Sequence, residues 1–167
     1  MARLALIGTA FVACSALAIV PLGKLHPVVL WNASSSVPIG LYLIEKRTPS
    51  THEIAILRLP DWASTLADRR GYLPTSALLL KPVVARKGDI VCRFGRFVFV
   101  NGRLRSVAFQ QDKMRRPLPS WRGCLKLDGG QILVLSKHED SFDSRYFGLV
   151  EDHNVIGVGQ LIFPPSK

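Results

Sequence analysis

A run of three serines can supply a nucleophile. The last of them, Ser36, lies two residues before Pro38 and four before Gly40, and the chain continues with Leu41 and Tyr42. Hydroxyl, proline and glycine residues in this order predict a rigid turn that enters a strand, and such a turn can hold a serine hydroxyl exposed for attack. A serine cluster before a proline is also an ordinary loop sequence, so this segment alone leaves both interpretations open.

Lys81 is the only charged residue in the apolar segment 77–85, and it can supply a base. Alternation along a strand puts Leu79 and Val83 on the same face as this lysine. Burial among such neighbours disfavours the ammonium form and lowers the pKa of a lysine, so that the neutral amine can take a proton from a serine hydroxyl. The alternative is a lysine on an edge strand whose ammonium group extends to water.

A third polar segment, 141–148, contains Asp143 and Arg145. These residues are two apart, so on a strand they would share a face and could form an ion pair that supports the serine and the lysine. His138 and Asp143 could instead complete a Ser-His-Asp triad with a serine. Against the triad, His138 lies in a polar loop sequence, whereas Lys81 has the apolar setting that a neutral base requires.

The elements that must position these residues read mainly as strands. We expect strands at 40–46, 53–59, 77–85, 131–136 and 155–163, and a hairpin at 97–104 with its tight turn at Asn101-Gly102. Pro82 would restrict its strand to an edge, a bulge or a bend. One short helix is expected from 61 to 70, capped by Asp61 and ended by Gly71. The sequence therefore predicts a mainly antiparallel β domain.

An apolar segment from Leu4 to Leu22 carries no charge and is bracketed by Arg3 and Lys24. Because a bilayer core needs about 20 apolar residues of helix, we expect one uncleaved transmembrane helix within an anchor over residues 1–24. The remaining residues, 25–167, would form a single exported domain.

Three alternatives to the anchor remain open: cleavage after the small-x-small sequence at 16–18, a lipid on Cys14, and a buried helix of a soluble domain. The amino terminus and Arg3, set against Lys24 alone, give a small positive-inside bias. This bias favours a cytoplasmic tail, with the domain on the periplasmic side of the inner (plasma) membrane.

Cys92 and Cys124 lie outside the apolar segment. A disulfide between them would stabilise the fold by about 3–4 kcal/mol in the chain-entropy model, and an exported location would permit it. Two buried free thiols are the alternative. The sequence contains no C-x-x-C pair and no paired Cys/His spacing, so we expect no metal site.

The chain of 167 residues carries 22 Lys and Arg against 12 Asp and Glu, a net charge of +10, and its 48% hydrophobic content excludes a disordered protein.

Between residues 93 and 126 Asp112 is the only acid, and this stretch could attract an anionic leaflet or an acidic partner. A solvated basic face is the alternative. No aromatic-interleaved nucleic-acid motif is present, so no nucleic-acid partner is expected. The bases of this stretch are Arg93, Arg96, Arg103, Arg105, Lys113, Arg115, Arg116, Arg122 and Lys126.

Taken in order, the motifs resemble those of signal peptidases. Ser-x-Pro-x-Gly-Leu-Tyr at 36–42, a lysine strand that ends in Lys-Gly-Asp at 87–89, and Ser-Phe-Asp-Ser-Arg-Tyr-Phe-Gly at 141–148 are similar to the Ser/Lys proteases of that family. Arg-Pro-Leu-Pro at 116–119 and Trp121 resemble the conjugal-transfer (TraF-type) subtype, which processes the pilin of a conjugation system. The resemblance implies a signal-peptidase-like β domain.

The resemblance also implies roles for individual residues. Ser36 corresponds to the nucleophile, Lys81 to the general base, and Asp143 with Arg145 to the pair that supports the site. Ser34 corresponds to the hydroxyl that helps the Ser36 backbone N–H to hold the oxyanion. General leader peptidases have their serine three residues before the proline, which would select Ser35 instead.

The reaction that the resemblance implies is acyl transfer on a pilin precursor, ending in hydrolysis or in cyclisation, with no metal or organic cofactor. Two alternatives remain. One is a general leader peptidase acting on many exported proteins. The other is a structural component of the conjugation apparatus that keeps the fold without the chemistry.

Overall fold

The computed structural model describes residues 29–164. The predicted anchor over residues 1–24 and its three alternatives lie outside the described residues. Within 29–164 no helix has both the length and the apolar character needed to cross a bilayer.

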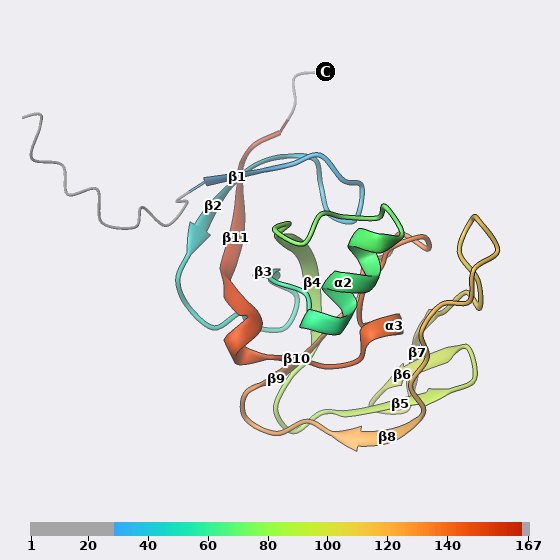
Figure 1. Cartoon of the computed structure of the whole chain (residues 1–167). Coiled ribbons are helices and arrows are strands. Elements are labelled where there is room, and N and C mark those ends of the chain that lie inside the picture. Colours follow the sequence, from blue (N-terminus) through green and yellow to red (C-terminus); the bar gives the residue numbers. More distant parts are fainter. Residues whose placement is uncertain (1–28, 165–167) are drawn as a thin grey trace, which may run out of the picture.

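The larger of two sheets has seven strands, and each neighbouring pair is antiparallel (Figure 1). The expected strands at 40–46, 53–59, 77–85, 131–136 and 155–163 all lie in this sheet, with ends that differ by a few residues. In spatial order the strands are β1 (Val29–Asn32), β2 (Gly40–Glu45), β11 (Val155–Phe163), β3 (Ile54–Leu57), β4 (Leu79–Ala85), β9 (Gln131–Val134) and β10 (Val150–Glu151).

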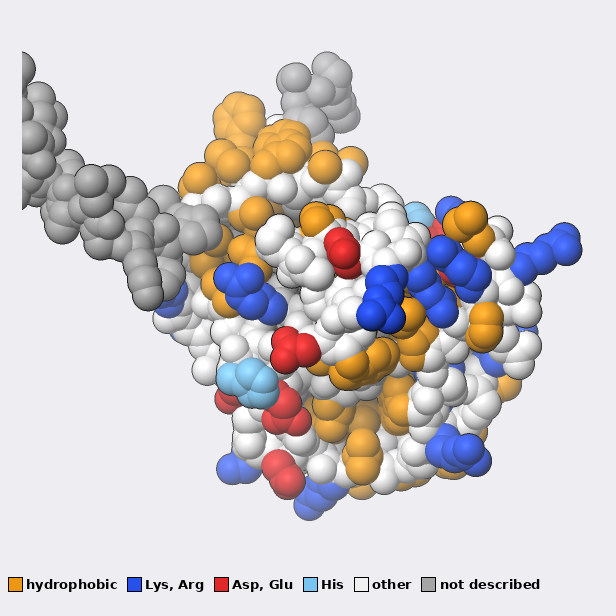
Figure 2. All heavy atoms as spheres, viewed as in Figure 1, with side chains coloured by type: hydrophobic (Ala, Val, Ile, Leu, Met, Phe, Trp, Pro, Cys, Tyr) orange, Lys and Arg blue, Asp and Glu red, His pale blue; other side chains and the backbone are white. Residues whose placement is uncertain are grey.

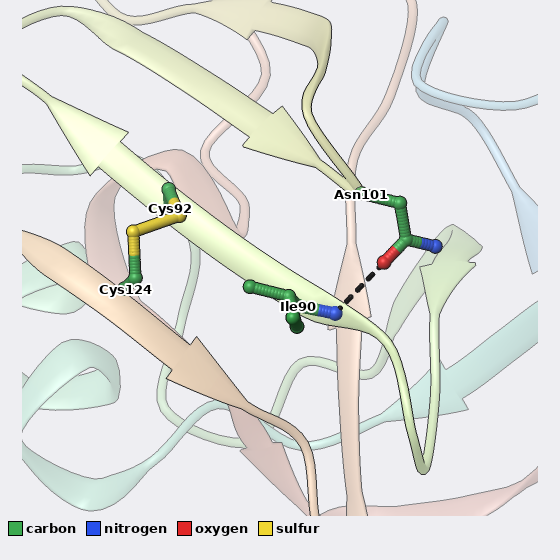
Figure 3. The surroundings of a disulfide bond; sticks show 4 residues. All are labelled: Ile90, Cys92, Asn101 and Cys124. Atoms are coloured by element: carbon green, nitrogen blue, oxygen red, sulfur yellow. Dashed lines mark hydrogen bonds between the residues drawn. A yellow bond between two sulfur atoms is a disulfide. The ribbon is translucent and has the colours of Figure 1, made fainter.

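The smaller sheet has four antiparallel strands in the order β7 (Arg103–Val107), β6 (Phe97–Val100), β5 (Ile90–Phe94) and β8 (Gly123–Lys126). The predicted hairpin is confirmed, because Asn101 and Gly102 join β6 to β7 with φ values of 50° and 75°. Positive φ at both central positions is what a type I′ turn requires. The Asn101 side chain also accepts a hydrogen bond from the Ile90 N–H at 2.9 Å, which ties the turn to β5 (Figure 3).

A disulfide joins the two strands β5 and β8, which are direct neighbours in the smaller sheet. Cys92 and Cys124 are partners in the register of this pair, and their sulfur atoms are bonded (Figure 3). Of the two alternatives open from the sequence, the structure therefore contains the disulfide.

Within residues 29–164 three short helical segments connect the strands: α2 (Asp61–Arg69), α3 (Ser144–Phe147) and the 3₁₀ turn η1 (Asp152–Asn154). The expectation that Asp61 caps α2 is wrong, because Pro60 occupies the N-cap position and no side chain caps the helix. Proline fixes the φ angle that helix entry needs, and Asp61 is then the first helical residue. Gly71, with φ of 70°, follows the end of the helix as expected.

The strand β4, which carries Lys81, lies inside the larger sheet between β3 and β9. Of the edge, bulge or bend expected for Pro82, the edge is therefore excluded and a bulge is found, because the register against β9 shifts between Val83 and Ala85. Leu79 and Val83 join the core cluster that includes Ala63 of α2, so this face of β4 is covered by the helix.

Candidate active site

The turn that carries Ser36 is held by the side chain of Asn32, the last residue of β1. Asn32 Nδ2 donates hydrogen bonds to the carbonyl oxygens of Ser34 at 2.8 Å, Val37 at 3.2 Å and Pro38 at 3.0 Å. This role of Asn32 could not be predicted from the sequence, because the bonds depend on how the turn folds back over the strand. A buried amide that satisfies three carbonyl groups fixes the conformation of the turn, and with it the direction of the serine side chains.

Ser36 and Lys81 lie in hydrogen-bond contact. Lys81 Nζ is 2.7 Å from Ser36 Oγ and 2.7 Å from Ser141 Oγ, and the two hydroxyl oxygens are 3.3 Å apart. Lys81 is only 5% exposed. A serine hydroxyl and a buried amine at this distance are the arrangement that activates a nucleophile by an adjacent base.

Burial lowers the pKa of Lys81 from 10.5 to about 8, with Asp143 opposing the shift and Arg145 adding to it. The neutral amine of Lys81 is therefore far more populated near neutral pH than that of an ordinary lysine, as the apolar neighbours on β4 led us to expect.

Two serines near the site were missed by sequence reasoning. Ser141 contacts both Ser36 and Lys81, although its segment had been singled out only for Asp143 and Arg145. Ser136 Oγ donates to the Ser36 carbonyl oxygen at 2.7 Å, so it holds the backbone of the nucleophile turn. Their only sequence signal is a hydroxyl residue flanking the acidic motif, and that signal is too common to be specific.

Asp143 and Arg145 form the expected ion pair, but not on a strand. Asp143 is the N-cap of α3, and its carboxylate accepts from Arg145 Nε at 2.9 Å and Nη2 at 2.8 Å. The pair is buried, with Asp143 0% and Arg145 2% exposed. A short helix forms because an aspartate at the N-cap satisfies a free backbone N–H. Asp143 itself keeps an extended backbone, with φ of −148°, so its carboxylate can reach the guanidinium of Arg145 in the first turn.

The ion pair reaches the serine and the lysine through the loop 136–143. Arg145 donates to the carbonyl oxygens of Ser136 at 2.8 Å, His138 at 2.9 Å and Glu139 at 3.0 Å. Asp143 Oδ2 accepts from the Ser136 N–H at 2.9 Å. These bonds fix the loop, and the loop presents the hydroxyls of Ser136 and Ser141 to the Ser36 turn.

The Ser-His-Asp alternative is not formed in the structure. Both carboxylate oxygens of Asp143 are engaged by Arg145 and the Ser136 N–H. His138 lines the cavity beside Ser36, and among the described residues its ring makes no hydrogen bond with Asp143.

Ser34 and Ser35 also line the cavity. The Ser34 hydroxyl donates to Asn32 Oδ1 at 3.1 Å, so it would have to turn toward the cavity before it could bind an oxyanion. Ser36, rather than Ser35, is the serine in contact with Lys81.

A cavity of about 910 Å³ opens over Ser36 and Lys81. Its far wall is the loop 109–118, which Asp112 holds in place by accepting from Tyr72 Oη and, at 2.7 Å, from Arg116 Nε. Arg70 Nη1 donates to the Pro117 carbonyl at 2.9 Å and ties the same loop to the end of α2. The Arg-Pro-Leu-Pro motif thus belongs to the wall of the cavity. Within residues 29–164 no group of three His, Cys, Asp or Glu side chains could hold a metal ion.

Comparisons with known proteins show the family of the chain. Residues 2–164 match the family described as signal peptidase, peptidase S26. The plasmid transfer protein TraF of Escherichia coli is 32% identical over 139 residues, which cover 76% of this chain and 78% of the relative. A crystal structure of a signal peptidase I from Enterococcus faecalis matches with a TM-score of 0.40 and 19% identity, over 68% of this chain and 98% of that one. The chain therefore belongs to the signal peptidase family, peptidase S26, a family of serine-type peptidases.

Proposed function

We propose that this protein is a membrane-anchored serine endopeptidase that processes a conjugative pilin precursor, with Ser36 as nucleophile and Lys81 as general base. The observation that carries the proposal is the 2.7 Å contact between Lys81 Nζ and Ser36 Oγ at a buried position. A lysine is suited to this role only where burial lowers its pKa, as it does here to about 8.

The reaction would proceed by acyl transfer. Neutral Lys81 takes the Ser36 hydroxyl proton as Oγ attacks the scissile carbonyl carbon, and the Ser36 N–H together with a rotated Ser34 hydroxyl would bind the resulting oxyanion. The Lys81 ammonium then gives its proton to the leaving amine as the C–N bond breaks. Water releases the acyl group from Ser36, or an amine of the substrate displaces the serine oxygen and closes a ring.

Ser141, Ser136 and the buried ion pair would position the reacting groups. Ser141 Oγ, at 2.7 Å, keeps Lys81 Nζ directed at Ser36. Asp143 and Arg145 hold the loop that carries both supporting serines. Small displacements of Lys81 or of the loop would lower the rate, because the reacting atoms must be held within about 3–3.5 Å of one another.

An exposed apolar surface supports a location at the membrane. Val29, Trp31, Leu43 and Phe163 are exposed on the neighbouring strands β1, β2 and β11 at one end of the larger sheet, and Figure 2 shows hydrophobic side chains gathered in this part of the molecule. The surface adjoins residue 29, to which the predicted anchor leads, and Trp31 also lines the cavity. A bilayer contact here would bring the cavity to a membrane-held precursor.

The disulfide supports the periplasmic side of the membrane. A bond between Cys92 and Cys124 is compatible with an oxidising compartment and is rare in the cytoplasm. The pilin as substrate follows from the resemblance of the motifs to the conjugal-transfer subtype, and similarity to a plasmid transfer protein supports a role in conjugation. Exported proteins in general, which are the substrates of a leader peptidase, remain the second candidate substrate class.

Mass spectrometry of the pilin tests the proposal. The pilin would be isolated from cells that carry the transfer system with the wild-type protein, with Ser36→Ala, or with the matched control Ser35→Ala. We expect mature pilin with the wild type and with Ser35→Ala, and only precursor with Ser36→Ala. Mature pilin in the Ser36→Ala strain would leave a structural role as the better explanation. Only precursor in the Ser35→Ala strain would favour Ser35 as the nucleophile, at the spacing from proline that leader peptidases have.

A further inference from the structure

The smaller sheet sends two hydrogen-bond donors to the backbone of α3. Arg93 Nη1, from β5, donates to the Arg145 carbonyl oxygen. Trp121 Nε1, just before β8, donates to the Ser144 carbonyl oxygen at 2.8 Å. Both acceptors belong to the short helix that also contains the Arg145 side chain of the site. The two contacts connect this sheet to the helix, although the sheet lies at the opposite end of the molecule from β1 (Figure 1).

Arg93 is a buried arginine, and its guanidinium makes two hydrogen bonds to backbone carbonyl groups. Its side chain is only 3% exposed, and its other hydrogen bond goes to the Gly95 carbonyl at 3.0 Å. Burial lowers the pKa of Arg93, with Tyr146 opposing the shift. A buried guanidinium is costly unless it is well bound, so its contribution is the bonds that it makes, and one of them holds α3.

The position of α3 determines that of the serines that contact the dyad. Asp143 is the N-cap of the helix, and it binds the Ser136 N–H at 2.9 Å. Ser136 in turn holds the Ser36 carbonyl, and Ser141, two residues before the cap, contacts Lys81. A shift of α3 would therefore lengthen contacts at both the nucleophile and the base.

The disulfide fixes the spacing between the two donors. Arg93 directly follows Cys92 on β5, and Trp121 lies three residues before Cys124 at the start of β8. Arg93 is also the register partner of Gly123. We propose that the four-stranded sheet is a brace for the Asp143–Arg145 turn, in which Arg93 and Trp121 are positioning residues and the Cys92–Cys124 bond holds them at a fixed separation.

Trp121→Phe is the most selective test, because it keeps the aromatic bulk and removes the Nε1–H donor. The matched control is Trp62→Phe, which changes an exposed tryptophan of α2 that is outside the cavity. For Trp121→Phe we expect kcat to fall about twofold to tenfold with KM unchanged, the range of a single lost hydrogen bond. Amide hydrogen exchange should rise at Phe147 and Gly148, whose N–H groups close α3.

A second pair of variants tests the disulfide. The double substitution Cys92→Ser with Cys124→Ser should produce the same pattern, and Trp62→Phe is again the control. If the double cysteine substitution and Trp121→Phe both act through α3, a protein that carries all three changes should lose less kcat than the product of the two separate losses. Arg93→Lys, which keeps a charge and a donor, should retain more activity than Arg93→Met.

The expected kcat values depend on the proposed function, whereas the exchange rates do not. A wild-type protein that cleaves no pilin precursor would refute the proposed function. Hydrogen exchange at α3 would then be the measurement that tests the brace. Unchanged exchange at Phe147 and Gly148 in both Trp121→Phe and the double cysteine variant would overturn the brace. The brace would also be overturned if Trp121→Phe and the double cysteine substitution lowered kcat independently, so that the combined loss equalled the product of the separate losses.

Discussion

The lowered pKa of Lys81 predicts how activity depends on pH. With a pKa of about 8, about a tenth of Lys81 is neutral at pH 7, whereas a lysine at the usual value of 10.5 would be neutral in only about 0.03% of molecules. Burial therefore raises the population of the active base at pH 7 by about 300-fold. The rate of acylation should rise about tenfold from pH 7 to pH 9 and then level off.

The assay is the initial rate of precursor cleavage between pH 6 and pH 10 at substrate concentrations well below KM, which reports the free enzyme. We expect one inflection near pH 8. An inflection near pH 6.5 would implicate a histidine as the base, and a rate that still climbs at pH 10 would mean that Lys81 is not desolvated. Either result would refute the reasoning.

The same pKa difference should appear in stability, with a defined sign. Between about pH 8 and pH 10.5 the unfolded chain holds a proton on Lys81 that the folded protein lacks, so the free energy of unfolding should increase with pH across this window, by up to about 3 kcal/mol. Below pH 8 both states hold the proton, and this contribution is absent. Urea unfolding of the wild type and Lys81→Met isolates the contribution, and a difference between them that does not change with pH would contradict it.

The other predictions concern single contacts of the site. Ser141→Ala removes one of two hydrogen bonds to the lysine, and kcat for precursor cleavage should fall about tenfold with KM unchanged. Ser34→Ala should lower kcat by about 10²–10³-fold if its hydroxyl binds the oxyanion, and wild-type kcat would exclude that role. Asp143→Asn leaves a buried guanidinium without its carboxylate and should cost about 3–5 kcal/mol in urea unfolding, whereas a loss below 1 kcal/mol would contradict the pairing. Cys92 and Cys124 should resist alkylation in the native protein until they are reduced, and immediate labelling of both would refute the disulfide.

Features that depend on neighbouring residues could be predicted from the sequence. Asn101-Gly102 specifies its own hairpin turn, because both residues tolerate positive φ. Lys81 could be identified because alternation along β4 places apolar residues on its face, and that pattern is visible without the fold. The pairing of Asp143 with Arg145 was predicted because both residues belong to one short segment, although Asp143 lies at the N-cap of a helix rather than on a strand.

Features that depend on distant residues could not be predicted. The bond from Ser136 to the Ser36 carbonyl spans 100 positions, and that from Lys81 to Ser141 spans 60. Nothing in the sequence near Ser141 or Ser136 distinguishes them from other loop serines. The turn conformation that lets Asn32 bind three carbonyl groups is likewise a product of the assembled sheet.

The central claim is that Ser36 becomes acylated with Lys81 as its base. The most direct test is mass spectrometry of protein that has been mixed with precursor, quenched with acid and digested. We predict that the peptide containing Ser36 gains the mass of the acyl fragment in the wild type and gains none in Lys81→Arg, whose guanidinium stays protonated. An acyl adduct in Lys81→Arg at the wild-type rate, or an adduct on a residue other than Ser36, would contradict the account.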